Sequence, residues 1–319
     1  MPTLLVTGGA GFIGGYTASI ALDLGWDVRI LDNLSTGSNS TVQALEAMGA
    51  TFFTGDVRDE TVVNKAVNGC DAIAHFAAQT SVPRSMEQPE ETMEINVGGT
   101  STILKACHAH AVKRFVMASS AAVYGTRDEF PLREHHAGLF HSPYADSKWQ
   151  NERQVLEAKE TGMEAVALRF FNVYGPGQRP DGAYAAVVPK FIEVALAGQP
   201  ATIFGDGLQT RDFVHVRDAA RAVLMLATQP WDSKRTHVYN VCTETECSLL
   251  DLMNEIHNVL EDVSPDIPRH APIHGPERAG DITRSVGSNS NLCLDTGWAP
   301  TVEFTEGLRQ QILNALQGA

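Results

Sequence analysis

A glycine-rich turn between a short apolar run and an amphipathic segment constrains the fold of this chain more than any other feature of its sequence. Residues 3–7 (TLLVT) are mostly apolar, and residues 8–14 (GGAGFIG) match both G-x-G-x-x-G and G-x-x-G-x-x-G. Apolar side chains then recur at helical spacing as far as Gly25. A strand that enters a helix through closely spaced glycines is typical of a βαβ unit whose helix N-terminus binds a dinucleotide.

A second strand supports this interpretation and indicates which dinucleotide binds. Residues 27–31 form another largely apolar run, and Asp32 ends it 18 residues after Gly14. A carboxylate at this place accepts hydrogen bonds from ribose hydroxyls and repels a 2′-phosphate, so it favours NAD over NADP. Asp56 and Val57 end a third run, where the acidic residue either bonds the adenine amino group or is a solvated strand end. For the glycines, the alternative is a tight loop without a ligand.

Seven short runs rich in apolar residues alternate with segments of helical spacing. The predicted strands are residues 3–7, 27–31, 50–53, 71–75, 114–118, 165–170 and 237–241. This alternation predicts an α/β fold with a Rossmann-like, doubly wound parallel sheet. Because apolar residues often follow one another within these runs, we expect strands buried on both faces under flanking helices.

The second half of the chain has a different residue composition and pattern, which predicts a smaller domain. Residues 172–184 and 198–211 are rich in Gly, Pro and polar side chains, whereas helical spacing returns at residues 218–227. We therefore expect a Rossmann domain over residues 1–175, to which the chain returns at about 212–242. Residues 176–319 then form mainly a smaller, interleaved α/β domain that binds the substrate.

Composition excludes several classes of function. With 24 Lys and Arg against 38 Asp and Glu, the net charge is −14, which disfavours binding to nucleic acid or to an anionic membrane. The five cysteines are never spaced as C-x-x-C, so they suggest neither disulfides nor a metal site. We find neither a signal-peptide pattern nor about 20 consecutive apolar residues, so we expect a cytoplasmic protein without a membrane segment.

Residues 142–148 (SPYADSK) carry the pattern that predicts the chemistry. Ser142 and the proline after it are suited to begin a helix, on which Tyr144 and Lys148 lie four residues apart and share a face. A tyrosine with a pKa of about 10 becomes a base only beside cations such as Lys148 and a bound nicotinamide ring. Ser120 ends the fifth strand, at the edge where open α/β sheets bind ligands. A helix-surface pair and a strand-end cap are the alternatives for these residues.

Eleven segments, taken in order, give the chain a specific resemblance. They are TGGAGFIG, DNLSTG, GDVRD, HFAAQTSVPRS, INVGGT, SSAAVYG, SPYADSK, LRFFNVYGPGQ, VPKFI, FGDGLQTRDFVHVRD and PERAGDI. Through them the chain resembles the extended short-chain dehydrogenase/reductases that act on nucleotide sugars, and most closely the UDP-glucose (UDP-galactose) 4-epimerases. The resemblance covers nearly the whole length.

This resemblance implies a role for each of a set of residues. The catalytic residues would be Ser120, Tyr144 and Lys148, and the first two would also contact the substrate. The NAD contacts would be Gly8, Gly11, Phe12, Ile13, Gly14, Asp32, Asn33, Ser35, Thr36, Gly37, Asp56, Val57, Phe76, Ala77, Ala78, Asn96, Ser119, Tyr144 and Lys148. A UDP-sugar would be held by Asn172 at the diphosphate, Val188 along the uracil, Arg211, Arg278 and Asp281 at phosphate and ribose, and Ser285 beside the C2 substituent.

Ala121 and Ala122 reduce the number of reactions that the resemblance allows. Related dehydratases and decarboxylases carry an acidic residue just after the catalytic Ser or Thr, where this chain has two alanines. The resemblance therefore implies NAD-dependent 4-epimerisation of a UDP-hexose through a 4-keto sugar, and Ser285 is small enough to leave room for an N-acetyl group. A 4,6-dehydratase, a UDP-glucuronate decarboxylase or epimerase, and a non-catalytic NAD-binding regulator are the alternatives. The homodimer usual in such families would pair the helices expected over residues 90–110 and 144–161.

Overall fold

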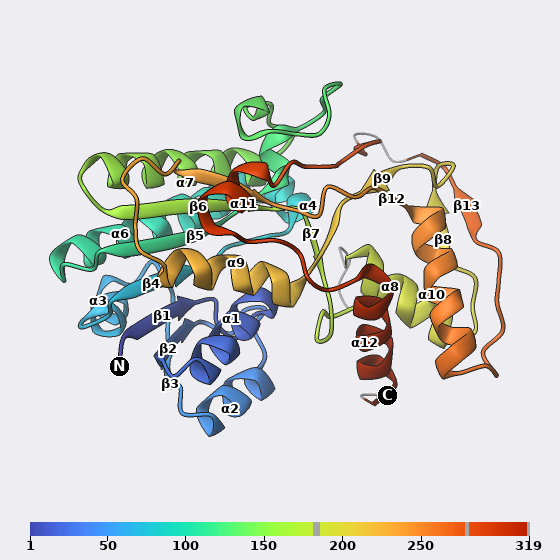
Figure 1. Cartoon of the computed structure of the whole chain (residues 1–319), viewed down its shortest axis with the longest axis horizontal. Coiled ribbons are helices and arrows are strands. Elements are labelled where there is room, and N and C mark those ends of the chain that lie inside the picture. The colour runs from blue at the N-terminus through green and yellow to red at the C-terminus, as the bar shows by residue number, and fades with distance from the viewer. Residues whose placement is uncertain (181–185, 278–280, 318–319) are drawn as a thin grey trace.

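A seven-stranded parallel sheet forms the larger part of the molecule in the computed structural model, which describes residues 1–180, 186–277 and 281–317 (Figure 1). The strand order is β11-β6-β5-β4-β1-β2-β3, and all six pairings are parallel. The strands are β1 (Thr3–Thr7), β2 (Asp27–Asp32), β3 (Thr51–Thr54), β4 (Ala72–His75), β5 (Arg114–Ser120), β6 (Glu164–Phe170) and β11 (Val238–Val241). Each predicted run forms one of these strands, so the predicted doubly wound sheet is confirmed.

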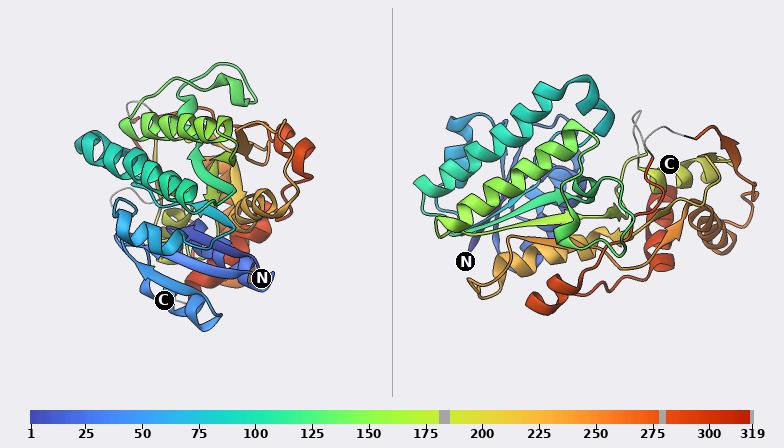
Figure 2. Two further views of the ribbon diagram at one scale, coloured as in Figure 1. Left: turned by 90° about the vertical axis from the view of Figure 1, so that its left-hand side faces the viewer. Right: turned by 90° about the horizontal axis from the view of Figure 1, so that it is seen from above.

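Helices cover both faces of this sheet (Figure 2). They are α1 (Phe12–Asp23), α2 (Asn39–Ala47), α3 (Glu60–Val67), α6 (Gly99–Ala109), α7 (Pro143–Glu160) and α9 (Val216–Thr228). Leu4 and Val6 of β1 share a core with α1 and α9, whereas Leu5 shares the opposite core with α3, α6 and α7. Because successive side chains of a strand point to opposite faces, one apolar run serves both cores.

The helix expected over residues 90–110 is present and contains a π-helical turn. After α4 (Val82–Glu87) and α5 (Pro89–Met93), the chain forms a π-helical turn, η1 (Glu94–Gly98), before α6 begins. A Cβ atom at Gly99 would lie 2.6 Å from Val57 Cγ2, so this glycine allows α6 to approach the end of the third strand closely. The expected helix therefore continues through a π-helical turn, in which i→i+5 hydrogen bonds replace the α-helical ones.

Within the described residues, the smaller part consists of three helices and short strand pairs. The helices α8 (Val187–Leu196), α10 (Leu249–Val263) and α12 (Phe304–Gln317) share one apolar core. The short strands are β7 (Asn172–Tyr174), β8 (Thr202–Phe204), β9 (Thr210–Arg211), β10 (Phe213–His215), β12 (Cys247–Ser248) and β13 (Ile273–Gly275). They pair as β7 with β10, β8 with β13, and β9 with β12. Among the helices within the described ranges, none has the length and apolar character needed to cross a membrane.

The chain passes between the two parts more than once. β11 joins the large sheet beside β6, as the strand predicted at residues 237–241 requires. Near the C-terminus, α11 (Ser290–Thr296) and Trp298 also pack onto the larger part, where Trp298 Nε1 donates to the Asp218 carbonyl at 3.0 Å. The division at residue 175 stays a prediction.

Candidate active site

The glycine turn after β1 is built so that only glycines fit its closest contacts. Gly8 has a φ of +69°, and a Cβ atom there would lie 2.7 Å from the Ala77 nitrogen. A Cβ atom at Gly14 would lie 2.3 Å from the Gly8 carbonyl oxygen. Gly11 caps α1 without a side-chain hydrogen bond, and the first turn of α1 carries no acidic residue. The first N–H groups of α1 are therefore available to an anion, which fits a dinucleotide pyrophosphate.

Asp32 ends β2 beside this turn and is oriented by the backbone. Its Oδ2 accepts from the Ala10 nitrogen at 3.0 Å and its Oδ1 from the Leu34 nitrogen at 2.8 Å, and only 8% of the residue is exposed. A Cβ atom at Gly37 would lie 2.9 Å from Asp32 Oδ1, so only a glycine leaves room for the carboxylate at this position. Each oxygen keeps a lone pair for a ribose hydroxyl, which suits the predicted role. The predicted contacts Asn33, Ser35 and Thr36 lie on the exposed loop that follows.

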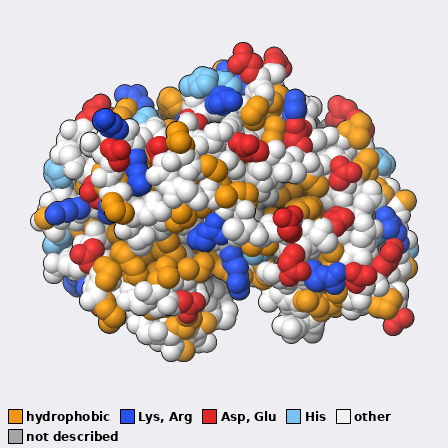
Figure 3. Space-filling view, in the orientation of Figure 1, with side chains coloured by type: hydrophobic (Ala, Val, Ile, Leu, Met, Phe, Trp, Pro, Cys, Tyr) orange, Lys and Arg blue, Asp and Glu red, His pale blue; other side chains and the backbone are white. Residues whose placement is uncertain are grey.

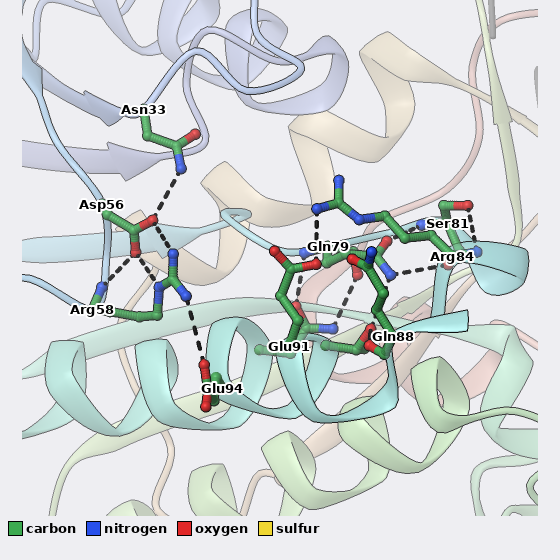
Figure 4. Close-up of polar contacts among 11 residues, drawn as sticks. Asn33, Asp56, Arg58, Gln79, Ser81, Arg84, Gln88, Glu91 and Glu94 are labelled. Carbon is green, nitrogen blue, oxygen red and sulfur yellow. Dashed lines mark hydrogen bonds and ion pairs between the residues drawn. The ribbon is translucent and has the colours of Figure 1, made fainter. Parts of the chain in front are cut away.

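Asp56 is engaged by a partner that the sequence analysis missed. Arg58 donates to both Asp56 carboxylate oxygens at 2.9 Å, Asn33 Nδ2 donates at 3.1 Å, and Arg58 also lies 3.8 Å from Glu94 (Figure 4). The hydrogen bond from Arg58 is the main reason why the pKa of Asp56 is lowered to about 2. Asp56 is thus ionised and part of a polar row at the β2–β3 edge, while Val57 is buried against Gly99. A direct adenine contact stays a prediction.

The residues after β4 lie against the glycine turn. Phe76, Ala77 and Ala78 are partly exposed, the Ala77 nitrogen donates to Thr7 Oγ1 at 3.3 Å, and Phe76 stacks on Phe170 with ring centroids 6.5 Å apart. The ends of β1, β2, β4 and β5 all lie at the carboxyl edge of the sheet, where ligands of open α/β sheets bind. Figure 3 shows the surface hollowed between the larger and the smaller part, with Lys and Arg side chains next to the hollow.

Ser120, Tyr144 and Lys148 come together at this edge from two elements. Ser120 is the last residue of β5, and Ser142 caps α7 through a bond to the Ala145 nitrogen, with Pro143 as the first helical residue. Lys148 is 5% exposed; its Nζ donates to the Ala118 carbonyl at 3.0 Å and lies 6.0 Å from the centre of the Tyr144 ring. A helix-surface pair is therefore excluded for Lys148, which is buried.

Burial shifts the protonation equilibria of this group. It raises the pKa of Tyr144 above its ordinary value, while a hydrogen bond with Ser120 acts in the opposite direction. It also lowers the pKa of Lys148 to about 8. In the chain alone Tyr144 is thus a neutral phenol at pH 7, so the lowering expected for a base depends on an added positive charge such as a nicotinamide ring.

Asn96 and Ser119 use their side chains within the protein. The Asn96 amide donates to the Gln79 carbonyl at 3.0 Å and to Ser147 Oγ at 2.8 Å, and its oxygen accepts from the Gln79 nitrogen at 2.8 Å. The Ser119 hydroxyl donates to Glu152. Asn96 therefore braces the loop after β4 against α7, and direct contacts of Asn96 and Ser119 with NAD stay predictions.

Part of the predicted substrate site is brought together. Arg211 Nη2 donates to Asp281 Oδ1 at 2.7 Å, and its Nη1 donates to the Ile282 carbonyl at 2.6 Å. Ser285 is 8% exposed, and its nitrogen donates to the Thr210 carbonyl at 3.2 Å, so it is not a solvent-facing turn residue. Arg278 lies outside the described residues.

The remaining two predicted substrate residues lie on different elements. Asn172 begins β7 directly after β6 and is partly exposed, whereas Val188 on α8 is 2% exposed and belongs to the core of the smaller part. Because the Val188 side chain is buried, it can contact a base only if the structure around it opens. Within the described ranges, no group of three or more His, Cys, Asp or Glu side chains is arranged to hold a metal ion.

Sequence reasoning also missed a buried ion pair next to Lys148, formed by Glu152 and Arg169. Two signals were available. Glu152 follows Lys148 by four residues, hence on the same face of α7, and Arg169 is a charged residue inside the apolar run 165–170.

Known proteins resemble this chain over its whole length. Residues 4–242 match the family described as NAD dependent epimerase/dehydratase family. The UDP-glucose 4-epimerase of Lacticaseibacillus casei is 32% identical over 318 residues, 94% of this chain and 92% of the relative. The structure of UDP-N-acetylglucosamine 4-epimerase from Methanobrevibacter ruminantium in complex with UDP-N-acetylmuramic acid has a TM-score of 0.91 at 33% identity, covering 100% of this chain and 99% of that one. For the Thermus thermophilus UDP-glucose 4-epimerase complex with NAD, the TM-score is 0.86 at 34% identity, with 99% of both chains covered.

Proposed function

The chain belongs to the NAD dependent epimerase/dehydratase family, and on this premise we propose that it is an NAD-dependent 4-epimerase of UDP-hexoses. The observation that carries the proposal is the convergence of Ser120, Tyr144 and Lys148 with the glycine turn at one edge of the sheet. The epimerase names of its relatives support the same reaction.

Each of the three residues has one task in the proposed reaction. Tyr144 takes the proton of the C4 hydroxyl, and Ser120, its hydrogen-bond partner, donates to the same sugar oxygen. Lys148 holds the nicotinamide ribose with the ammonium hydrogens not used by the Ala118 carbonyl. When bound, NAD+ supplies the hydride acceptor and returns the same hydride. Tyr144 holds the proton while the 4-keto sugar turns about its diphosphate link, and then gives it back to the C4 oxygen.

The residues just after Ser120 lack the second acid/base group that the competing reactions need. Ser120 is followed by η2 (Ala121–Tyr124), whose first two residues are alanines, and the first carboxylate after Ser120 in the sequence is Asp128. Elimination of water requires a second proton-transfer group at the sugar, and a decarboxylase requires a group that assists the loss of a carboxylate. We therefore rank the dehydratase and the decarboxylase below the epimerase.

The buried Ser285 supports activity on N-acetylated sugars as well as plain ones. Ser285 is held by its backbone to Thr210, beside the ion pair of Arg211 and Asp281 that we assign to the substrate phosphate and ribose. A small side chain at a buried position leaves volume that a bulky one would fill. We infer that both UDP-glucose/UDP-galactose and their N-acetyl counterparts are substrates.

The experiment that tests the function needs no added cofactor. Purified protein is incubated separately with UDP-galactose, UDP-N-acetylgalactosamine and UDP-glucuronate, and the nucleotide sugars are resolved by chromatography. We expect UDP-glucose from the first and UDP-N-acetylglucosamine from the second. A pentose product from UDP-glucuronate would favour the decarboxylase, and no conversion of any substrate, with or without added NAD, would contradict the proposal.

We further propose a cytoplasmic homodimer that pairs the α5–α6 segment and α7 of two chains. A groove of about 760 Å³ lies between α4, α5 and the start of α7. Apolar side chains including Met86, Met93 and Phe140 line this groove, and Met86 is 61% exposed. Exposed apolar surface of this kind often marks an interface between protein chains. The cytoplasmic location has separate support, because five free cysteines suit a reducing compartment. Light scattering that gives the mass of a monomer at all concentrations would contradict the dimer.

A further inference from the structure

Glu152 lies at the centre of a buried polar cluster next to Lys148. Arg169 donates to both of its carboxylate oxygens, from Nε at 2.9 Å and from Nη2 at 2.7 Å, and Ser119 Oγ donates to Oε1 at 2.5 Å. Glu152 and Arg169 are each 2% exposed, and Ser119 is 4% exposed. Arg169 also donates to Tyr124 Oη at 2.9 Å. The carboxylate is therefore paired with a guanidinium, held by three hydrogen bonds and shielded from water.

This carboxylate connects the two elements that carry the catalytic residues. Glu152 lies one turn after Lys148 on α7, and Ser119 stands between Ala118 and Ser120 on β5. The Ala118 carbonyl accepts the Lys148 ammonium at 3.0 Å, and Ser120 hydrogen-bonds Tyr144. The hydrogen bond that Ser119 donates to Glu152 therefore fixes α7 against the short strand segment that receives Lys148 and presents Ser120.

The charges around Lys148 make Glu152 its electrostatic partner. Burial lowers the pKa of Lys148 to about 8, and the negative charge of Glu152 opposes this shift. Other titratable groups near the cluster are Tyr144 on the same helix, Tyr124 on η2, Arg169 on β6, which is paired with Glu152, His75 on β4 and His237 just before β11. His75 is neutral, because burial and the positive charge of Lys148 lower its pKa to about 3.

We propose that Glu152 is a positioning residue for the catalytic site: its buried carboxylate, held by Arg169 and Ser119, keeps Lys148 charged and seated on the Ala118 carbonyl beside Ser120 and Tyr144. The role of Glu152 in catalysis rests on the proposed function. Its effect on the charge and position of Lys148 does not depend on that function. A loss of the carboxylate favours the neutral amine, and a neutral Lys148 no longer helps to stabilise the Tyr144 phenolate.

The direct test measures the ionisation of Lys148 without a substrate. In full-length protein labelled with 13C-lysine, the Cε resonance of Lys148 is assigned by its absence in Lys148→Met and followed against pH. We expect Glu152→Gln to lower the midpoint by about one unit, since a nearby opposite charge shifts a pKa by about 1 to 3 units. Glu157→Gln, an exposed position on the same helix, is the matched control and leaves the midpoint unchanged.

A double variant separates this electrostatic role from a structural one. Glu152→Gln alone leaves Arg169 buried without its carboxylate, so loss of folding could explain any defect. Glu152→Gln with Arg169→Met removes both charges. We expect it to recover the unfolding midpoint in urea relative to the single variant, while the Lys148 midpoint stays below that of the wild type. An unchanged Lys148 midpoint in both variants would overturn the proposal.

Kinetics give the second readout. The alkaline limb of the kcat profile, where Lys148 loses its proton, should move to lower pH in both variants, with the KM for UDP-galactose within about twofold of the wild type. Glu152→Asp, which keeps the charge, should return the limb toward its wild-type position. A wild type that converts no UDP-sugar defeats the proposed function, whereas the Lys148 titration still decides the role of Glu152.

Discussion

Replacing Asp32 by Asn should shift the cofactor preference of this chain from NAD toward NADP. Asp32 is nearly buried, and each carboxylate oxygen accepts one backbone N–H, from Ala10 and from Leu34. The remaining lone pairs can accept from the adenosine ribose that we expect there, and the negative charge would repel a 2′-phosphate. Asn has nearly the same shape but no charge and one acceptor oxygen instead of two.

The magnitude follows from the bonds that change. A hydrogen bond to a charged group contributes about 1.5–3 kcal/mol, so the loss of one such acceptor for a ribose hydroxyl weakens NAD binding about 10-fold to 150-fold. NADP gains at the same time, because the repulsion disappears. Asp32→Ala should change the preference in the same direction, but it leaves the N–H groups of both Ala10 and Leu34 without an acceptor, whereas Asn still accepts from one of them. That costs about 1–3 kcal/mol of stability for each group that stays buried.

Calorimetric titration with NAD and NADP, after bound dinucleotide has been removed, measures both affinities for the wild type and the two variants. Thermal unfolding of the unliganded proteins separates the structural cost of Asp32→Ala from the electrostatic effect shared with Asp32→Asn. The reasoning is refuted if the wild type binds NADP more tightly than NAD, or if the ratio of the two affinities is the same in Asp32→Asn as in the wild type.

Three further predictions concern the chemistry. Tyr144→Phe should abolish turnover and leave NAD bound, because the ring still packs and only the proton acceptor is lost; activity within tenfold of the wild type, measured by product chromatography, would remove Tyr144 from its role. Ser285→Tyr should lose the N-acetylated pair and keep the plain one, since overpacking a closed site costs about 1–3 kcal/mol, or about one to two decades in rate; no turnover of UDP-N-acetylgalactosamine by the wild type would contradict this. Purified protein should carry NAD through gel filtration, and an acid extract without dinucleotide, together with dependence on added NAD, would count against an internally recycled hydride.

The sequence predicts the large sheet well because local pattern and fold agree there. Residues 3–7 appear unchanged as β1, and the run predicted at 114–118 extends two residues further, to Ser120. The glycine turn is equally predictable from the sequence, because a Cβ atom at Gly8 or Gly14 would collide with backbone atoms. Where such steric demands act within a few residues, the local structure can be predicted from the amino-acid types alone.

Tertiary context explains what the sequence analysis missed. The π-helical turn Glu94–Gly98 has no local signal beyond two glycines. It lies where Asn96 meets Gln79 and Ser147, residues from two other segments. In the same way Arg58 follows Asp56 by two residues, but its contact with Glu94 depends on how β3 and η1 approach one another. Spacing along the chain does not determine such approaches.

The geometry of α7 explains why its motif was recognised and its buried partner was not. Tyr144, Lys148 and Glu152 are spaced by four residues, and each such step advances about 40° beyond a full turn of an α-helix. The stripe therefore rotates along the helix as α7 runs back from the carboxyl edge over the sheet, and burial increases along it. Tyr144 is half-buried, Lys148 is 5% exposed and Glu152 is 2% exposed. We propose that Tyr144 and Lys148 meet ligands, and their types therefore belong to a recognisable motif. The type of Glu152 depends instead on its partner Arg169, which reaches it because β6 lies next to β5 beneath α7.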